Sequence, residues 1–346
     1  MRARFKHAWV AAALLVVAGI FGWSFFGPRD VEEVVVYTSV DDVFARPVAA
    51  AFENETGIAV RLVPDTEETK STGLVNRLIA EKDRPRADVF WSGDPVRAEL
   101  LKKKGVAASY KSPQAAGLPP QYSDPQGYWT GFSARARVLI FNRNLVGAGD
   151  EPASVLDLAS QRFKGRACMA NPLFGTTSMH ASALFAALGD KQATRFFNDF
   201  LSNGGRLASS NGEVRRLVAE GICTVGLVDT DDAHVAKMEG KPIGMVYPDA
   251  GGIGTLIIPN AAVLIARGPN VWAGKEFIDY LLRPETAEAL VQSDARQIPL
   301  RAGAAVPKGV VPLERITTMQ VDYAVLGRRL DELSRGFLKD WVDRAR

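Results

Sequence analysis

The stretch VVVYTSVDDVFARPVAAAFENETGIAVRLV, residues 34–63, decides the fold class because it is typical of a strand, a helix and a second strand in direct succession. Val34 to Tyr37 is an apolar β-branched run that predicts a strand. Residues 41–56 place apolar side chains at helical spacing, and Gly57 follows where a helix commonly ends on a left-handed residue. A strand over 58–63 completes a β-α-β unit, which favours a mostly parallel sheet covered by helices.

The same alternation continues to about residue 293. A helix expected to begin at Asp94-Pro95 has an N-cap, a proline in its first turn and Gly105 at its end. The other expected strands cover 87–91, 137–142, 165–170, 222–228 and 255–265, and the other expected helices cover 71–82, 176–188, 191–201, 211–219, 272–282 and 284–293.

Two α/β lobes follow from this order, with a ligand cleft between them. The chain of 346 residues exceeds the usual size of one domain. We expect the first lobe to comprise residues 28–135 and about 255–305, and the second lobe to comprise 136–254 and about 306–346.

The N-terminus has the pattern of an export signal. Residues 1–7 carry Arg2, Arg4 and Lys6, and residues 8–26 are almost wholly apolar. Residues 1–27 are therefore either a cleaved signal peptide or an uncleaved anchor, since residues 8–26 are long enough to span a bilayer. Both alternatives predict a periplasmic or other extracytoplasmic protein.

Composition excludes one class of partner. The 42 basic and 39 acidic residues are interspersed and leave a net charge of +3, so no basic stripe marks a nucleic-acid surface. Cys168 and Cys223 are the only cysteines. Two buried thiols are the preferred interpretation, and a disulfide is the alternative in an exported chain.

Polar residues cluster where expected strands run into helices, which is where ligands bind in open α/β sheets. At one of these junctions, a glycine and three hydroxyl residues begin a helix, an arrangement that favours an anion, with ordinary capping as the alternative. The candidate ligand-binding residues at the four junctions are Ser39, Asp41, Ser92, Asp94, Gly175, Thr176, Thr177, Ser178, Asp229, Asp231 and Asp232.

Asp229, Asp231 and Asp232 place three carboxylates within four residues. One carboxylate is enough to cap a helix, and three repel one another, so a cation, an ammonium group or an arginine is expected beside them. Arg135 and Arg137 share one face of an expected strand. A guanidinium in a cleft suits a carboxylate, carbonate or phosphate, and Arg135 is the stronger candidate.

An enzyme is not expected. Only three histidines are present, and no nucleophile elbow, zinc-protease helix, phosphate loop or dinucleotide fingerprint occurs. His180 and His234 are expected to be packed or surface residues, and no cofactor is expected. The competing class is a metal-dependent hydrolase with an aspartate-rich cleft.

Seven motifs in order carry a resemblance over nearly the whole chain after the leader. They are VVVYTSVDD, AFENETGIAV, ADVFWSGDP, RARVLIFN, GTTS, NGEVRRLVAEG and NAAVLI. In these motifs the sequence resembles the periplasmic solute-binding proteins of ABC importers, in particular their ferric-iron-binding branch. The resemblance implies a type II two-lobed fold, an ABC permease as partner, closure of the lobes around a cargo, and no chemistry. A monomer is expected.

The resemblance also implies roles for individual residues. In that family the helix start matching Gly175 to Ser178 helps to hold an anion, an arginine matching Arg135 lies near it, and loops matching Ser39–Asp41 and Ser92–Asp94 face the cleft. The family's ferric site has two adjacent tyrosines where this chain has Asp231 and Asp232. Carboxylates lack the selectivity of phenolates for ferric iron, so this departure argues against tyrosine-mediated iron binding.

Three kinds of cargo remain open. The first is a metal or metal chelate held by Asp229, Asp231 and Asp232, with Asp231 and Asp232 as the direct ligands. The second is a zwitterionic solute with its amine at the aspartates and its carboxylate or phosphonate at Thr176 to Ser178. The third is a polyol-like or phosphorylated solute. The second uses both kinds of charge in the cleft and is preferred on physical grounds.

Overall fold

The computed structural model describes residues 32–65 and 72–345. The expected leader, residues 1–27, lies outside the described residues. Among the described helices, none is long and apolar enough to cross a membrane.

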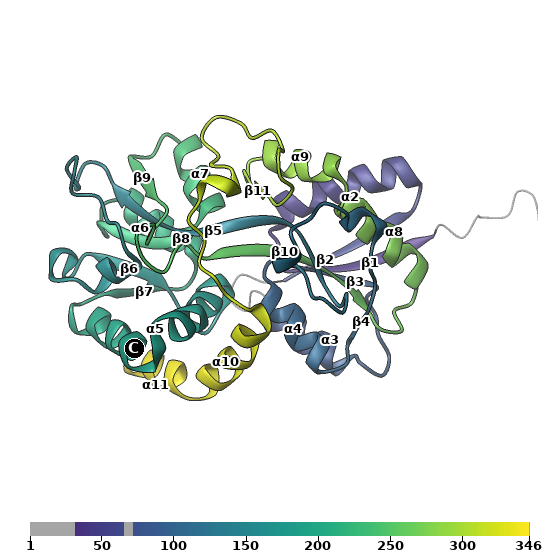
Figure 1. The fold of residues 1–346 in the computed structure, drawn as a ribbon, viewed down its shortest axis with the longest axis horizontal. Helices are drawn as coiled ribbons and strands as arrows, with labels where there is room; N and C mark the ends of the chain where they lie inside the picture. Colours follow the sequence, from purple (N-terminus) through teal and green to yellow (C-terminus); the bar gives the residue numbers. More distant parts are fainter. Residues whose placement is uncertain (1–31, 66–71, 346) are drawn as a thin grey trace, which may run out of the picture.

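The described strands form one sheet with the main order β2-β1-β3-β10-β5-β8-β6-β7 (Figure 1). The strands are β1 Glu33–Thr38, β2 Ala59–Pro64, β3 Val89–Ser92, β4 Ala107–Ala108, β5 Thr130–Asn142, β6 Ala167–Ala170, β7 Arg206–Ala208, β8 Val225–Asp229, β9 Ile243–Val246, β10 Ile257–Ile265 and β11 Ile298–Pro299. The helices are α2 Asp42–Thr56, α3 Thr72–Ala80, α4 Pro95–Lys103, α5 Gly175–Ser202, α6 Asn211–Ala219, α7 Thr230–Met238, α8 Val271–Leu281, α9 Pro284–Gln292, α10 Tyr323–Arg335 and α11 Phe337–Arg344.

The β1-α2-β2 unit has the predicted form. β1 and β2 pair in parallel, and Gly57 ends α2 at φ 75°, where its N–H donates to the Glu53 carbonyl. Along β1, Val34 and Val36 pack into the core beneath α2 and α8, whereas Val35 and Tyr37 pack on the opposite side with residues of α3 and α4. Burial on both faces explains why this strand is a continuous apolar run.

The sheet is less parallel than expected because its two central strands, β5 and β10, are antiparallel to each other. Residues 130–136 of β5 pair with β10, and residues 137–141 pair with β8. β5 thus carries the chain from one half of the sheet into the other, and β10 carries it back beside β5. Neighbouring strands that cross in opposite senses must be antiparallel.

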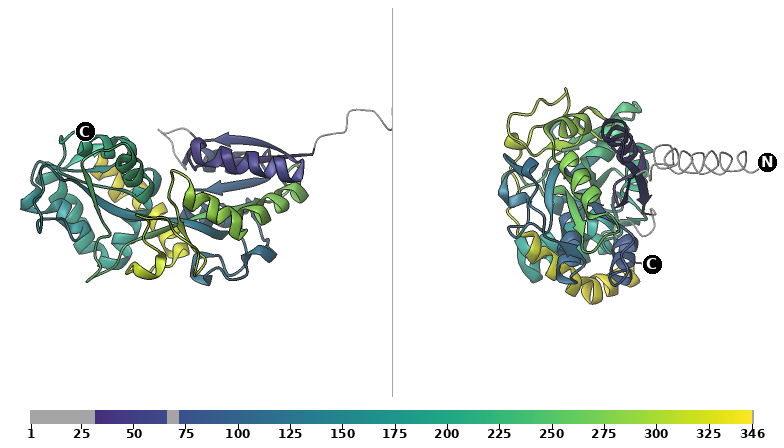
Figure 2. Two further views of the ribbon diagram at one scale, coloured as in Figure 1. Left: turned by 90° about the horizontal axis from the view of Figure 1, so that it is seen from above. Right: turned by 90° about the vertical axis from the view of Figure 1, so that its right-hand side faces the viewer.

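Two lobes lie on either side of this crossing, as Figures 1 and 2 show. We call the half with β1–β4, β10 and α2–α4 the first lobe, and the half with β6–β9 and α5–α7 the second lobe. The predicted lobe ranges remain a proposal, which the change of partner along β5 after Ala136 and the start of β10 at Ile257 support.

Helices α10 and α11 follow the last expected element and were not predicted. α10 packs against α4 of the first lobe and α5 of the second (Figure 1). The Ser182 hydroxyl on α5 donates to the Leu326 carbonyl, and the Tyr323 hydroxyl donates to the Ile257 carbonyl. Within α5, Gly189 at φ 75° breaks the helix between the two helices expected there. Cys168 and Cys223 are both buried and free.

Candidate functional site

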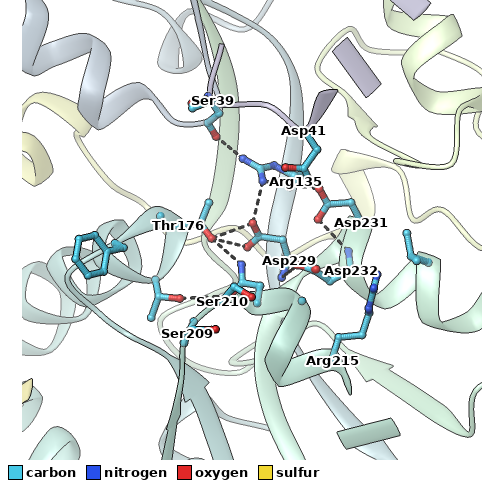
Figure 3. A pocket seen from close by; sticks show the side chains of 18 of the residues that line it. Ser39, Asp41, Arg135, Thr176, Ser209, Ser210, Arg215, Asp229, Asp231 and Asp232 are labelled. Carbon is cyan, nitrogen blue, oxygen red and sulfur yellow. Dashed lines mark hydrogen bonds and ion pairs between the residues drawn. The ribbon is translucent and has the colours of Figure 1, made fainter. Parts of the chain in front are cut away.

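A cavity of about 350 Å³ lies between the two lobes (Figure 3). The first lobe lines it from the loops after β1 and β3, from α2 and from β5. The second lobe lines it from the first turns of α5, α6 and α7. The lining residues are Ser39, Asp41, Val43, Phe44, Gly93, Arg135, Ala170, Asn171, Phe174, Gly175, Thr176, Thr177, Ser209, Ser210, Asn211, Gly212, Arg215, Asp229, Asp231, Asp232 and Val235.

Three helices of the second lobe begin at this cavity because β6, β7 and β8 end there. Each strand is followed by a helix whose N-terminal turn carries the partial positive charge of the helix dipole. Ser210 caps α6 by accepting from the Glu213 N–H at 3.1 Å, whereas Phe174 at the start of α5 offers no side-chain acceptor. The cavity therefore has backbone dipoles that favour negative charge in the second lobe.

Asp229 is the centre of a buried ion-pair network. Its Oδ1 accepts from Arg137 Nη1 at 2.6 Å, its Oδ2 accepts from Arg135 Nη1 at 3.0 Å, and the Thr176 hydroxyl lies 2.9 Å from Oδ2. Burial alone raises the pKa of a carboxyl group, but the guanidiniums of Arg137 and Arg135 outweigh it and hold the pKa of Asp229 below its ordinary value. Asp229 is thus ionised and fully engaged.

The side chain of Arg137 has no exposed surface, and it binds three residues that line the cavity. Besides Asp229, it donates to the hydroxyls of Thr176 and Thr177 at 3.0 and 3.2 Å, and its Nε faces His180 Nδ1 at 3.4 Å. The two threonines of the expected anion site therefore use their hydroxyls to accept from this buried guanidinium. The sequence ranked Arg137 below Arg135, and the structure gives Arg137 the larger number of polar partners.

Arg135 connects the lobes. Its Nη2 donates to the Gly93 carbonyl of the first lobe, while Nη1 reaches Asp229 and lies 3.7 Å from Asp231 Oδ2 in the second. Its Nε–H is buried and has no acceptor in the described part of the chain. Burial works to lower the pKa of this guanidinium, but Asp229, Asp231 and Asp41 raise it above its usual value. A Cβ at Gly93 would lie 3.2 Å from Arg135 Nη2, so a glycine leaves room for this contact.

Asp231 and Asp232 are the remaining carboxylates of the cluster. Asp231 Oδ1 accepts from the Asp232 N–H at 3.0 Å, and Asp232 Oδ2 accepts from the Asp229 N–H at 3.4 Å. One ligand atom of each of the three aspartates lies within 4.8 Å of the others. However, both oxygens of Asp229 already accept from guanidiniums and a hydroxyl. The arginine expected beside the cluster is supplied by the protein, and Asp231 and Asp232 line the cavity next to it.

Three predicted site residues, Ser92, Asp94 and Ser178, are not among the residues that line the cavity. The Ser92 hydroxyl donates to the Asp94 carbonyl, and Asp94 Oδ1 caps α4 by accepting from the Arg97 N–H at 3.0 Å. The Ser178 hydroxyl donates to the Gly175 carbonyl and accepts from Arg97 Nη2 at 3.0 Å. These side chains shape the loops behind the cavity.

The sequence missed the junction at Ser209 to Gly212. Its strand, β7, has only three residues, too short for a recognisable β-branched run. The Ser210-Asn211-Gly212 start of α6 was nevertheless visible, since serine is a favoured N-cap residue and α6 was expected at these bounds. Arg215 on the same helix was also missed.

Acid is expected to destabilise the protein through His180. Burial first and Arg137 second lower the pKa of His180 to about 3, whereas an unfolded histidine titrates near ~6.5. The contribution of neutral His180 to the free energy of unfolding is fully present above about pH 6.5. It is lost by about 1.4 kcal/mol per pH unit as the pH falls toward the pKa of the folded state. His180→Asn keeps an acceptor near Arg137 but cannot titrate.

We expect the free energy of unfolding, measured with urea, to fall when the pH is lowered from about 6.5 to 4.5. The fall should be about 2–3 kcal/mol larger in the wild type than in this variant. His234, whose pKa burial lowers to about 4, is common to both proteins and cancels in the comparison. Parallel pH profiles of the two proteins would contradict the assignment.

Comparisons with known proteins identify a family and a fold for this chain. The family model described as bacterial extracellular solute-binding protein matches residues 84–325. The chain is 26% identical over 294 residues to "Iron uptake protein A1" of Synechocystis sp., covering 82% of this chain and 80% of that protein.

Two solved structures share the fold. The ferric binding protein from Campylobacter jejuni has a TM-score of 0.80 at 20% identity and covers 89% of this chain and 99% of its own. A periplasmic binding protein from Actinobacillus pleuropneumoniae with fructose-6-phosphate bound has a TM-score of 0.78 at 23% identity and covers 90% of this chain and 98% of its own. The expected type II periplasmic-binding fold is confirmed. With 242 of its residues matched by the family model, the chain belongs to the bacterial extracellular solute-binding proteins.

Proposed function

We propose that this chain captures a small solute between its lobes outside the cytoplasm and delivers it to the permease subunits of an ABC importer, without chemistry of its own. The cavity supports this proposal because both lobes line it and Arg135 touches both. Relatives carry names such as "Fe(3+)-binding periplasmic protein", which supports the same compartment. Tethering by residues 8–26 belongs to the proposal as the alternative to cleavage.

The cargo is, on this proposal, a small organic solute with a positive and a negative group. The observation that carries it is the saturation of Asp229 by Arg135, Arg137 and Thr176. Of the three clustered aspartates, a ferric ion or a catalytic divalent ion would be left with Asp231 and Asp232. Asp41 is the one further carboxylate among the described residues that line the cavity, and no tyrosine is among them. A hydrolase that depends on the three-aspartate cluster meets the same shortage of ligands.

The size and polarity of the cavity fit such a solute. A volume of about 350 Å³ lies within the range of about 300–1,000 Å³ that is usual for pockets that bind small molecules. Carboxylates, including those on the first turn of α7, line one part of the wall, while Arg215 and the first turns of α5 and α6 line another (Figure 3). A zwitterion can satisfy both parts, whereas a bare cation or a bare anion satisfies one.

The identity of the cargo can be measured directly. We expect native mass spectrometry of the protein purified from its own cell envelope to show a bound organic mass, and elemental analysis of the same sample to show iron far below one atom per chain. Stoichiometric iron without an organic ligand would overturn the cargo proposal. Turnover of generic phosphate esters with added divalent metals would overturn the binding-protein proposal itself.

A further inference from the structure

Arg215 differs from the other arginines of the site. It lies on α6, lines the cavity and is partly buried. Figure 3 shows its side chain extending from α6 toward the first turn of α7, beside Asp232. Within the described residues, neither a hydrogen bond nor an ion pair within 4 Å holds its guanidinium.

The other two guanidiniums are already used. Arg137 is fully buried against Asp229, and Arg135 pairs with Asp229 and the Gly93 carbonyl. On the same helix as Arg215, the exposed Arg216 pairs with Glu220 at 2.7 Å and lies 3.7 Å from Glu213. Among the described residues that line the cavity, Arg135 keeps only its Nε–H without an acceptor, whereas Arg215 can offer its whole fork of donors to a ligand.

We propose that Arg215 binds the anionic group of the cargo and so determines which charge the solute must carry at this end of the cleft. A guanidinium presents a planar fork of donors that matches a carboxylate, phosphate or phosphonate with two hydrogen bonds. The first turn of α6, with Ser210 and Asn211, lines the same wall, and its dipole adds to the preference for negative charge.

This inference deepens the proposed function and rests on it. It also fixes the orientation of a zwitterionic cargo: the anionic end lies against Arg215 on α6, and the cationic end lies toward Asp231 on α7. That differs from the expectation at the sequence level, which placed the anion at Thr176 to Ser178. Thr176 and Thr177 instead accept from Arg137.

The test is isothermal titration calorimetry of the full chain with four probes: inorganic phosphate, acetate, phosphoethanolamine and ethanolamine. We expect the wild type to bind phosphoethanolamine more tightly than phosphate or ethanolamine. Arg215→Gln should weaken binding of phosphoethanolamine and phosphate about tenfold to hundredfold, as expected for the loss of a hydrogen-bonded charge. The affinity for ethanolamine should stay the same or rise, since the variant removes a positive charge.

Arg216→Gln is the matched control, because it removes the same charge from the same helix outside the cavity. It should change each affinity less than twofold, and Arg215→Lys should recover part of the loss. Unchanged melting temperatures would show that the fold is intact. Equal binding of the anionic probes by wild type and Arg215→Gln, or no binding of any anionic probe by the wild type, overturns the inference. If the purified protein still carries an organic solute, the proposed function survives that failure.

Discussion

Asp229→Asn is expected to lower the free energy of unfolding by about 3–5 kcal/mol, because it leaves a buried guanidinium without its counter-charge. Arg137 has 0% of its side chain exposed and Asp229 has 2%, so solvent cannot replace the lost carboxylate. Arg135 loses its nearest carboxylate in the same variant. Urea unfolding at neutral pH measures the effect.

A second variant separates this ion pair from other contributions. In Asp229→Asn combined with Arg137→Met, no unpaired charge remains at the Arg137 position, so part of the lost stability should return. A loss below about 1 kcal/mol in the single variant would show that Asp229 is not needed to neutralise Arg137. Asp229 would then be available to bind a ligand directly.

The ends of the first strands and helices could be predicted because local signals mark them. Gly57 ends α2 and Asp94 caps α4, each at a position where backbone geometry selects the residue. The antiparallel centre of the sheet could not be predicted from such signals. It depends on the order in which β5 and β10 cross between lobes, which is a property of the whole chain.

Part of the site could also be predicted, because local sequence signals mark the ends of the strands where it lies. The rule that ligands lie beyond strand ends located Ser39, Asp41 and the aspartate cluster, all of which line the cavity. It could not separate a carboxylate that faces a ligand from one that faces an arginine. Arg137 and Asp229 are 92 residues apart, and their pairing follows from the register of β5 against β8. The structure is therefore needed to tell which aspartate of the cluster pairs with the arginines.

Asp231→Asn combined with Asp232→Asn is expected to abolish cargo binding while the fold stays intact. Loss of two charged partners corresponds to roughly a 10²–10⁴-fold weaker affinity. Folding should survive because Asp229 keeps its ion pairs with Arg135 and Arg137. Asparagine oxygens at 231 and 232 can also still accept from the backbone N–H groups of residues 232 and 229. Calorimetry with the solute identified on the purified protein measures the affinity.

Glu239→Gln is the control, since Glu239 is an exposed carboxylate at the other end of α7 and its loss should leave the affinity unchanged. The double variant also separates the kinds of cargo. A zwitterion held by charge at both ends should lose most of its affinity in this variant and in Arg215→Gln alike. A metal held by the aspartates should be lost in the double variant alone, because Arg215 repels cations. Unchanged affinity in both would mean that the cargo is held by the hydroxyl and amide groups of the cleft, as a polyol would be.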